Sequence, residues 1–443
     1  MKTLAAVLVL SASTAFALPD GRFDGKPEKT PPDVKTRASA AAVAETDSRV
    51  WVEFEAPGKA ERQAAVDAGV SVEEIRPGLI AGIATPKALA RAQAAGLKVR
   101  MTVSLRQRFG SLDFPEKDAI YHNYKELEAD MRSLAARAPD LVSIFSIGKS
   151  TLGKDLWAVR LAKGAKGTKP SGKPGIVFLG THHAREHLST EVPLLLAKHL
   201  VDNRAEPEIA RLLETRDIYI IPMVNPDGVE YDISGGKYHM HRKNMSKNGD
   251  GSTGVDLNRN YAWGWGGGGA SPDPGDDTYR GPSAFSEPES KAVRDFVSAR
   301  PNLKVLISYH TFSELILYPW GGSNEEIADK KALAAFRAMA GEMARMTGYT
   351  PEQSSDLYIA TGDTCDWAWG EKGIFAFTFE LTPKSMWDGG FYPGATAVQK
   401  TFQANIRPAL YLIDLSDDPL RAVKGSGVFA AAPAAKSQGE ATK

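Results

Sequence analysis

Four apolar runs separated by helical segments constrain most strongly what this chain can fold into. The runs cover residues 175–179, 217–221, 305–308 and 374–379 and are apolar at nearly every position. Strands of a parallel sheet show this pattern because both of their faces are buried. Helical patterns lie around the runs, at residues 124–137, 189–202, 287–298, 331–347 and 397–415. The alternation predicts an α/β domain with a mixed, mostly parallel sheet flanked by helices.

A second, smaller unit precedes this domain, and a chain of 443 residues is long enough for both. Residues 50–54 alternate like a strand, and residues 80–83 and 99–103 have strand character as well. Alanine-rich stretches between them favour helices at residues 60–68 and 86–95. We therefore expect a small α+β open sandwich, folded over about residues 49–104.

The two ends of the chain have their own compositions. Residues 1–17 combine a basic start, a short apolar run and small residues before the end, which is typical of a secretory signal. No later apolar run reaches the ~20 residues that span a bilayer. We therefore expect a secreted or periplasmic protein. Residues 417–443 have no apolar periodicity and predict a disordered tail.

Charge and cysteine content limit the partners and the covalent structure. The 54 basic and 54 acidic side chains balance, so no global field favours nucleic acid or an anionic membrane. We expect neither as a partner, and we expect a monomer. The single cysteine, Cys365, excludes an intramolecular disulfide.

The strongest chemical motif follows the first buried run, at residues 179–187, LGTHHAREH. Ligands bind where such strands open into loops in α/β sheets. His183 and Glu186 are three residues apart, so both side chains can converge on one cation. A catalytic zinc takes three protein ligands and keeps one open position. His310 ends another buried run and is the third candidate, although a lone histidine at a strand end is more often structural.

The same residues permit a different zinc motif. In the inverted reading His183 and His187 both bind the metal and Glu186 acts as the base. That arrangement belongs inside a helix, where residues four apart share one face. The strand, glycine and threonine just before the motif favour a loop instead.

Three further segments carry groups suited to peptide hydrolysis. Glu380 ends an apolar strand, a setting that raises a carboxyl pKa and suits a general base. Asn258 and Arg259 lie in a glycine-bearing segment, and an arginine fork suits a free carboxylate. Arg242 is a cation that can stabilise a developing oxyanion. Taken singly, each has a plainer reading as a surface glutamate, a capped turn or a surface arginine.

Taken together, these segments resemble the zinc carboxypeptidases of the carboxypeptidase A type, from about residue 121 to residue 415. The resemblance implies a carboxypeptidase-like fold and zinc-dependent removal of the C-terminal residue of peptides. It assigns zinc to His183, Glu186 and His310 and the roles of base and proton shuttle to Glu380. By the same resemblance, Arg242 polarises the scissile carbonyl. Asn258 and Arg259 hold the terminal carboxylate, and Tyr358 closes over the substrate.

Residues 356–367, DLYIATGDTCDW, and the absence of disulfides are most similar to the bacterial carboxypeptidase T-like branch. In this family the stretch lines the pocket for the terminal side chain. Cys365 is small and apolar, and Asp363 is an acid two residues away. We therefore predict a mixed preference for apolar and basic terminal residues.

The resemblance also divides the chain. It implies a pro-segment at 18–110 and a catalytic domain at 111–416, between the signal peptide expected at 1–17 and the tail expected at 417–443. The segment 105–111, LRQRFGS, offers Arg108 to a trypsin-like activating protease, although it is equally consistent with an ordinary basic linker. The small domain is then an inhibitory pro-segment or, alternatively, a folding domain that never leaves. Members of the branch bind calcium, for which residues 248–251 and 273–277 offer oxygen ligands.

Two rival functions remain for a chain of this fold. An amidase of cell-wall peptides shares the fold and the metal, but it needs a different carboxylate pocket. A non-catalytic peptide-binding relative is expected to lack Glu380 or a metal ligand, and neither is missing here. Zinc-dependent release of C-terminal residues is therefore the preferred hypothesis.

Overall fold

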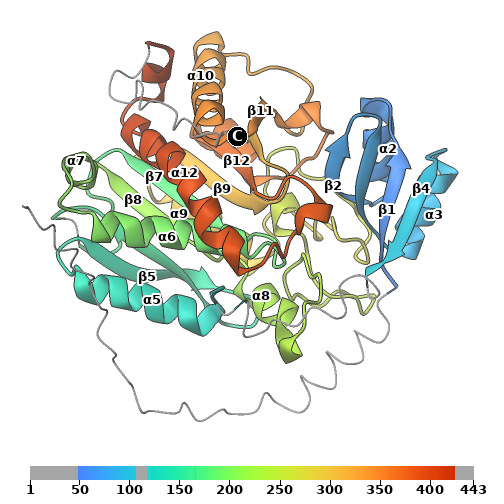
Figure 1. Ribbon diagram of the computed structural model, residues 1–443, viewed down its shortest axis with the longest axis horizontal. Helices are drawn as coiled ribbons and strands as arrows, with labels where there is room; N and C mark the ends of the chain where they lie inside the picture. The colour runs from blue at the N-terminus through green and yellow to red at the C-terminus, as the bar shows by residue number, and fades with distance from the viewer. Residues whose placement is uncertain (1–47, 106–117, 119, 165, 425–443) are drawn as a thin grey trace, which may run out of the picture.

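The computed structural model describes residues 48–105, 118, 120–164 and 166–424. The predicted signal peptide, the linker around Arg108 and residues 425–443 lie outside the described residues. The prediction of a disordered tail from residue 417 onward is wrong for residues 417–424, because Pro419–Lys424 form a short 3-10 helix in which Arg421 pairs with Asp414 and Asp417. The described chain forms a four-stranded and an eight-stranded sheet. The smaller unit lies beside one edge of the larger one (Figure 1).

The N-terminal unit is an open sandwich, as predicted. Its four-stranded sheet is antiparallel with the order β2-β3-β1-β4. Val52, Phe54 and Ile80 belong to the core beneath its two helices. The elements are β1 (Val50–Glu55), α2 (Lys59–Asp67), β2 (Ser71–Arg76), β3 (Leu79–Ala84), α3 (Pro86–Ala94) and β4 (Val99–Ser104).

The opposite face of this sheet contacts the larger domain. Trp51 and Ile83 pack there with Phe312, Met386 and Phe391 in one buried apolar cluster. Alternation along each strand sends neighbouring side chains to opposite faces. The small sheet is therefore covered by its own helices on one face and by the large domain on the other.

The edge strand β2 does not appear among the strands predicted from sequence. Only Val72 and Ile75 are apolar in its six residues, and a register shift against β3 falls between Val72 and Glu74. Both features disturb the alternation that indicates a strand. The side chain of Glu73 on this strand is only 6% exposed, because it contacts the large domain.

The large sheet has the predicted mixed, mostly parallel character. Its order is β11-β10-β12-β9-β7-β8-β6-β5. Parallel pairing joins β12, β9, β7 and β8 at the centre, whereas β10, β6 and β5 add antiparallel contacts. The strands are β5 (Val142–Lys149), β6 (Asp155–Leu161), β7 (Gly175–Gly180), β8 (Asp217–Ile221), β9 (Leu303–Thr311), β10 (Leu315–Tyr318), β11 (Thr350–Gln353) and β12 (Phe375–Leu381).

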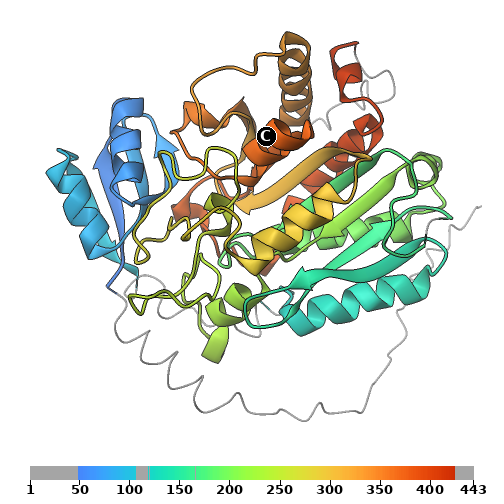
Figure 2. The ribbon, with the colours of Figure 1, turned by 180° about the vertical axis from the view of Figure 1, so that it is seen from behind.

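Helices cover both faces of this sheet (Figures 1 and 2). One core cluster joins α5, α6, α10 and α12 to one face, and a second joins α9 and α11 to the other. The helices are α5 (Tyr124–Arg137), α6 (Leu188–Asp202), α7 (Pro207–Thr215), α8 (Pro226–Asp232), α9 (Pro288–Ser298), α10 (Lys330–Thr347), α11 (Thr364–Lys372) and α12 (Ala395–Leu415). The predicted α/β architecture is confirmed, and the carboxyl ends of β7, β9 and β12 meet at one edge.

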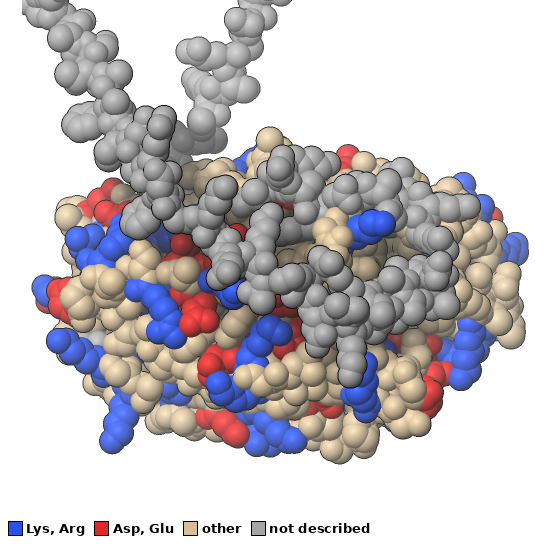
Figure 3. Space-filling view, turned by 90° about the horizontal axis from the view of Figure 1, so that it is seen from below, with Lys and Arg blue, Asp and Glu red and all other residues tan. Residues whose placement is uncertain are grey.

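Two further observations concern the exterior. Among the described residues no helix is both long and apolar enough to cross a membrane. On the face drawn in Figure 3, basic and acidic side chains are interspersed.

Candidate active site

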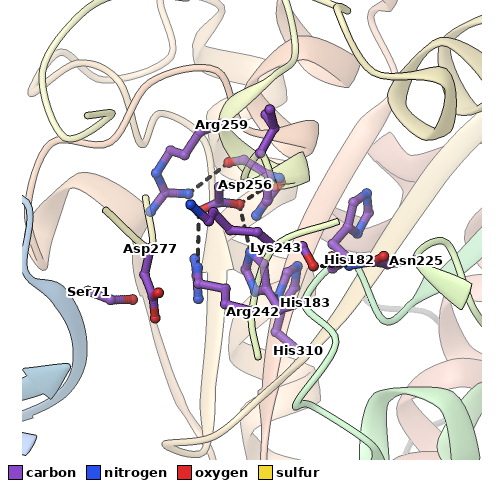
Figure 4. A network of polar contacts seen from close by, with 12 residues as sticks. Ser71, His182, His183, Asn225, Arg242, Lys243, Asp256, Arg259, Asp277 and His310 are labelled. Atoms are coloured by element: carbon purple, nitrogen blue, oxygen red, sulfur yellow. Dashed lines mark hydrogen bonds and ion pairs between the residues drawn. The ribbon is translucent and has the colours of Figure 1, made fainter. Parts of the chain in front are cut away.

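Three potential metal ligands converge at the carboxyl edge of the large sheet, and Figure 4 shows two of them, His183 and His310, side by side. His183 and Glu186 lie in the loop between β7 and α6, and His310 is the next-to-last residue of β9. His183 Nδ1 is 2.7 Å from Glu186 Oε1, and His310 Nδ1 is 3.0 Å from Glu186 Oε2. The two Nδ1 atoms are 3.1 Å apart. Residues separated by 127 positions therefore form one compact donor cluster.

These residues fit a catalytic zinc ion. Two imidazoles and one carboxylate are an established donor set for that metal. The other ring nitrogen of each histidine has a partner, at 3.0 Å in both cases: His183 Nε2 contacts Asp256 Oδ1 and His310 Nε2 contacts Ser308 Oγ. Such partners orient metal-binding histidines. Within the described ranges this is the only group of three acid, histidine or cysteine side chains placed to share an ion.

His187 does not join this cluster. Its Nε2 lies 2.9 Å from Asp232 Oδ2, and its ring packs near Tyr121, Tyr238 and Tyr392. The motif is a loop, because helix α6 begins only at Leu188. The geometry therefore does not support the inverted reading of the motif.

Asp256 organises the neighbouring charges, and sequence analysis gave it no role. It accepts a hydrogen bond from Arg242 Nε at 3.0 Å in addition to its contact with His183. Burial opposes ionisation, but Arg242 and His183 hold the pKa of Asp256 well below its usual range. The acid lies only two residues before Asn258, inside the segment that sequence analysis singled out.

The turn after Asp256 positions the two candidate carboxylate-binding residues. Asp256 also accepts the backbone N–H of Asn258 at 2.9 Å, starting the short 3-10 turn Leu257–Arg259. Arg259 donates from Nε to the carbonyl of Gly269 at 3.1 Å and from Nη1 to the carbonyl of Asn258 at 2.7 Å. These bonds hold the guanidinium against the backbone while it lines the cavity.

A cavity of about 830 Å³ brings most of the predicted residues together. Its lining includes nine of the ten candidates: His183, Glu186, Arg242, Asn258, Arg259, His310, Tyr358, Asp363 and Glu380. Cys365 is not among the lining residues. Its thiol is buried, with Sγ 3.2 Å from Oγ1 of Thr378, which does line the cavity.

Glu380 lies beside the donor cluster. Strand β12 pairs with β9 in a register that places Glu380 next to His310. Burial, together with the charges of Glu186 and Glu73, raises the pKa of Glu380 well above its usual range. An elevated carboxyl pKa suits a group that takes up and returns a proton near neutral pH.

At another part of the lining, two acids begin helix α11. Asp363 caps the helix by accepting the backbone N–H groups of Cys365 and Asp366 with one oxygen, Oδ1. Its other oxygen, Oδ2, is buried and makes no hydrogen bond to the described residues. Burial raises the pKa of Asp363, and burial with the nearby Asp363 charge raises that of Asp366. A cationic side chain entering here would find a carboxylate oxygen without a partner.

The acids of the 273–277 segment, one of the two considered for calcium, are paired with cations, whereas Asp250 of the other segment accepts hydrogen bonds from Ser252. Asp273 contacts Lys87 and Arg91, and Arg91 also contacts Asp276. Asp277 is 3.3 Å from Arg49 and 2.9 Å from Arg185. Three of these four cations belong to the N-terminal unit, so the 273–277 segment serves as an interface between the two units. Calcium is not supported by this arrangement.

Comparisons with known proteins agree with this geometry. A family model described as zinc carboxypeptidase matches residues 127–407. A zinc carboxypeptidase of Saccharothrix mutabilis subsp. capreolus is 35% identical over 317 residues, covering 70% of this chain and 72% of that protein. Carboxypeptidase B of Astacus astacus is 34% identical over 269 residues, covering 59% of this chain and 86% of the relative. The crystal structure of carboxypeptidase A from Helicoverpa armigera superposes with a TM-score of 0.71 at 23% identity, covering 86% of this chain and 98% of that one, which supports the fold.

A mixed sheet whose parallel strands bring two histidines, a glutamate and the further carboxyl of Glu380 to one cavity is the arrangement of an α/β metallohydrolase. The chain belongs to the zinc carboxypeptidase family, and the protein is a zinc-dependent metallocarboxypeptidase. The retention of Glu380 and of all three donor residues agrees with an enzyme and not with a non-catalytic relative.

Proposed function

We propose that this protein is an exported carboxypeptidase precursor, with zinc held by His183, Glu186 and His310, that releases apolar and basic residues from peptide C-termini. The observation that carries the proposal is the convergence of three metal donors, a general base and two carboxylate-binding side chains on one cavity. A zinc ion at this site supplies a Lewis acid and lowers the pKa of bound water.

The side chains around the cavity carry out proton transfer, oxyanion stabilisation and substrate binding. Glu380 takes a proton from the attacking water and passes it to the leaving amine, a transfer that its raised pKa favours. Arg242, held by Asp256, offers its remaining N–H groups to the developing oxyanion. Asn258 and Arg259 bind the terminal carboxylate, and Tyr358 covers the bound residue.

The preference for terminal side chains follows from the acids at the start of α11. An apolar side chain fits the pocket while Asp363 is protonated, because burial favours the neutral acid. A lysine or arginine side chain supplies the missing partner for Oδ2 and favours the ionised form. Cys365 contributes by keeping the wall behind Thr378 small and apolar.

The N-terminal unit acts as an inhibitory pro-segment in this proposal. Glu73 from β2 contacts the buried Arg185 and lies 3.9 Å from Arg242, which lines the cavity together with Glu73 itself. Gln63 from α2 receives the backbone N–H of Ile359 at 2.6 Å and donates to its carbonyl at 3.4 Å. Ile359 follows Tyr358, so the pro-segment restrains the residue that covers the substrate.

The proposed division of the chain keeps the boundaries expected from the sequence, except at the C-terminal end. Residues 1–17 are the signal peptide for export, 18–110 the pro-segment, 111–424 the catalytic domain with its final 3-10 helix, and 425–443 the tail. Activation requires a trypsin-like protease acting near Arg108. The active enzyme is a monomer that acts on peptide and protein C-termini.

The test measures zinc content and amino-acid release together. The purified chain is assayed on blocked dipeptides ending in Phe, Leu, Arg, Lys and Glu, before and after limited trypsin treatment. One zinc per chain and chelator-sensitive activity that increases on cleavage near Arg108 are the expected results. A chain that binds no zinc and is inert in both forms contradicts the proposal.

A further inference from the structure

A fully buried histidine next to the metal donors has no role in the chemistry described so far. His182 is 0% exposed and its ring stacks on that of His310, with centroids 5.6 Å apart. Its Nδ1 lies 3.2 Å from Ser308 Oγ, and its Nε2 lies 3.2 Å from Thr364 Oγ1 and 2.9 Å from Tyr261 OH. His182, shown near His310 in Figure 4, thus connects the strand that carries a metal donor to the helix that borders the cavity.

The direction of the hydrogen bonds around His182 is determined at Asn258. The backbone N–H of Thr364 donates to Asn258 Oδ1 at 2.9 Å, and a backbone N–H can only donate. The atom facing it is therefore the amide oxygen, and the amide nitrogen of Asn258 points the other way. Thr364 Oγ1 lies 2.8 Å from the same oxygen and must donate its only proton there.

The same reasoning extends to the metal donors. Because the Thr364 hydroxyl has given its proton to Asn258, it presents a lone pair to His182 Nε2 at 3.2 Å, which favours a proton on that nitrogen over a second lone pair. Nδ1 of a neutral His182 then accepts from the Ser308 hydroxyl. Ser308 Oγ, 3.0 Å from His310 Nε2, accepts the proton carried there. His310 is left with a bare Nδ1, the atom that faces His183 and Glu186.

We propose that His182 is a positioning residue: it passes the hydrogen-bond direction fixed at Asn258 and Thr364 on to His310, and so sets the metal-binding tautomer of His310. The metal site needs this setting, since a metal ion takes a bare ring nitrogen. The inference rests on the proposed roles of His310 and Asn258.

The reversed set of hydrogen bonds would also give every donor an acceptor, but it would leave His310 without a bare Nδ1 for the metal. If Tyr261 donated to His182 Nε2, the proton on Nδ1 would go to Ser308, and Ser308 would donate to His310 Nε2. His310 would then carry its proton on Nδ1, inside the donor cluster. The Thr364–Asn258 pair disfavours this arrangement, because a bare Nε2 of His182 would face the lone pair of Thr364 Oγ1.

The first experiment reads the tautomer directly. The full-length chain is labelled with ¹⁵N-histidine, zinc binding is measured, and long-range ¹H–¹⁵N spectra are recorded, with His182→Gln used to assign the resonance. The expected result is a neutral His182 ring protonated at Nε2. A ring protonated at Nδ1, or at both nitrogens, overturns the proposal. Failure of the unmodified chain to bind zinc counts instead against the proposed function.

The second experiment breaks the relay at a distance from the metal. Thr364→Val removes the hydroxyl and keeps the backbone N–H and the side-chain shape, whereas Thr364→Ser keeps the hydroxyl. In Thr364→Val we expect the zinc dissociation constant to rise about three- to tenfold, less than the ~10–100-fold for loss of a direct partner of a metal-bound histidine. KM for a blocked dipeptide should rise by up to about tenfold because Asn258 loses one anchor.

Matched variants separate the relay from packing. Thr364→Ser should restore both values, and Tyr261→Phe, which removes a His182 contact outside the relay, should leave them within about twofold. If Thr364→Val folds with normal zinc affinity, or if Tyr261→Phe weakens zinc as much as Thr364→Val does, His182 is a packed core residue and the relay is wrong.

Discussion

In two regions beside the same cavity, the pKa values of buried acidic side chains are shifted in opposite directions. Around the metal donors, Asp256 accepts hydrogen bonds from Arg242 and from the backbone of Asn258 and contacts His183, and its pKa is well below the usual range. At the start of α11, Asp363 and Asp366 have raised pKa values, and one oxygen of Asp363 has no hydrogen bond to the described residues. Both regions are buried, so burial alone does not explain the difference.

The difference lies in the fixed cations and donors that surround each acid. Charge at the metal region is needed in every turnover, and preorganised partners there cost no rearrangement at the moment of reaction. At the start of α11, which binds the terminal side chain of the substrate, the cationic partner is part of the substrate. Asp363 therefore stays protonated until a basic side chain binds. The comparison indicates that the acids near the metal donors keep one charge state in every turnover, whereas the charge of Asp363 changes with the substrate side chain.

The largest expected effect tests the metal region. Glu380→Gln removes the proton acceptor but keeps the size of the side chain, so kcat/KM should fall by about 10³-fold or more while zinc content is unchanged. Zinc analysis and dipeptide hydrolysis after activation measure both quantities. Glu325→Gln on the exposed surface is the matched control. Near-normal activity of Glu380→Gln would remove Glu380 from the role of base.

The next effect tests the side-chain region. Asp363→Asn keeps an oxygen to cap α11 but cannot ionise, so kcat/KM for Arg and Lys ends should fall about 10- to 100-fold. Values for Phe and Leu ends should change by less than about twofold. Equal losses for apolar and basic ends would show that Asp363 acts through the fold and not through recognition.

A pH series sharpens the same comparison. The pKa of Asp363 is raised, so its carboxylate forms only as the pH rises through that elevated value. In the wild type the ratio of kcat/KM for Arg over Phe ends should therefore increase with pH. The ratio should be flat over the same range in Asp363→Asn. A wild-type ratio that does not rise with pH contradicts the assignment.

A smaller effect concerns the acid that the N-terminal unit adds to the metal region. Glu73→Gln removes the charge that meets the buried Arg185 and lies near Arg242. The activity of the intact chain, relative to the trypsin-treated chain, should rise by about three- to tenfold as the inhibitory contact weakens. Glu55→Gln, on an exposed strand end of the same unit, should leave the ratio unchanged. An unaltered ratio in both variants would place inhibition elsewhere in the interface.

The smallest effect extends the comparison beyond the cavity, to a histidine held by two acids. His122 contacts Glu191 at 2.8 Å and Asp130 at 2.9 Å, and although burial opposes the charge, these acids raise its pKa. A raised histidine pKa stabilises the fold below the unfolded value of about 6.5, and the stabilisation is lost as pH rises through the folded value. The melting temperature of wild type should exceed that of His122→Gln by about 2 °C at pH 5.5 and by less at pH 8.5. A difference that does not shrink with pH refutes the paired imidazolium.

Much of the fold was accessible from sequence because it depends on local patterns. The double-sided apolar runs predicted β7, β8, β9 and β12, and residue spacing predicted α5, α6, α9, α10 and α12. The shorter helices α7, α8 and α11 were not predicted. Strand β2 was missed because its six residues hold only two apolar side chains and its ladder is irregular. Its burial comes from contact with the large domain, which no local pattern records.

The candidate site likewise contains residues that could be predicted from local sequence and residues that could not. His183, Glu186, His310 and Glu380 could be predicted because each sits at the end of a buried run. Asp256 and His182 could not be given roles, because their importance lies in partners distant in the chain: Asp256 lies 73 residues from His183, and His182 lies 126 residues from Ser308. The buried thiol of Cys365 illustrates the converse, since its place in the sequence indicated a lining residue and its side chain packs behind Thr378.

The sequence by itself determined the element types and the kinds of donor available, since periodicity and side-chain chemistry are short-range properties. Only the tertiary structure decided which nitrogen of each histidine faces the donor cluster, which acids meet cations, and which strand of the N-terminal unit contacts the cavity. The physical reason is that hydrogen-bond direction and charge pairing depend on distances between residues that only the sheet topology brings together.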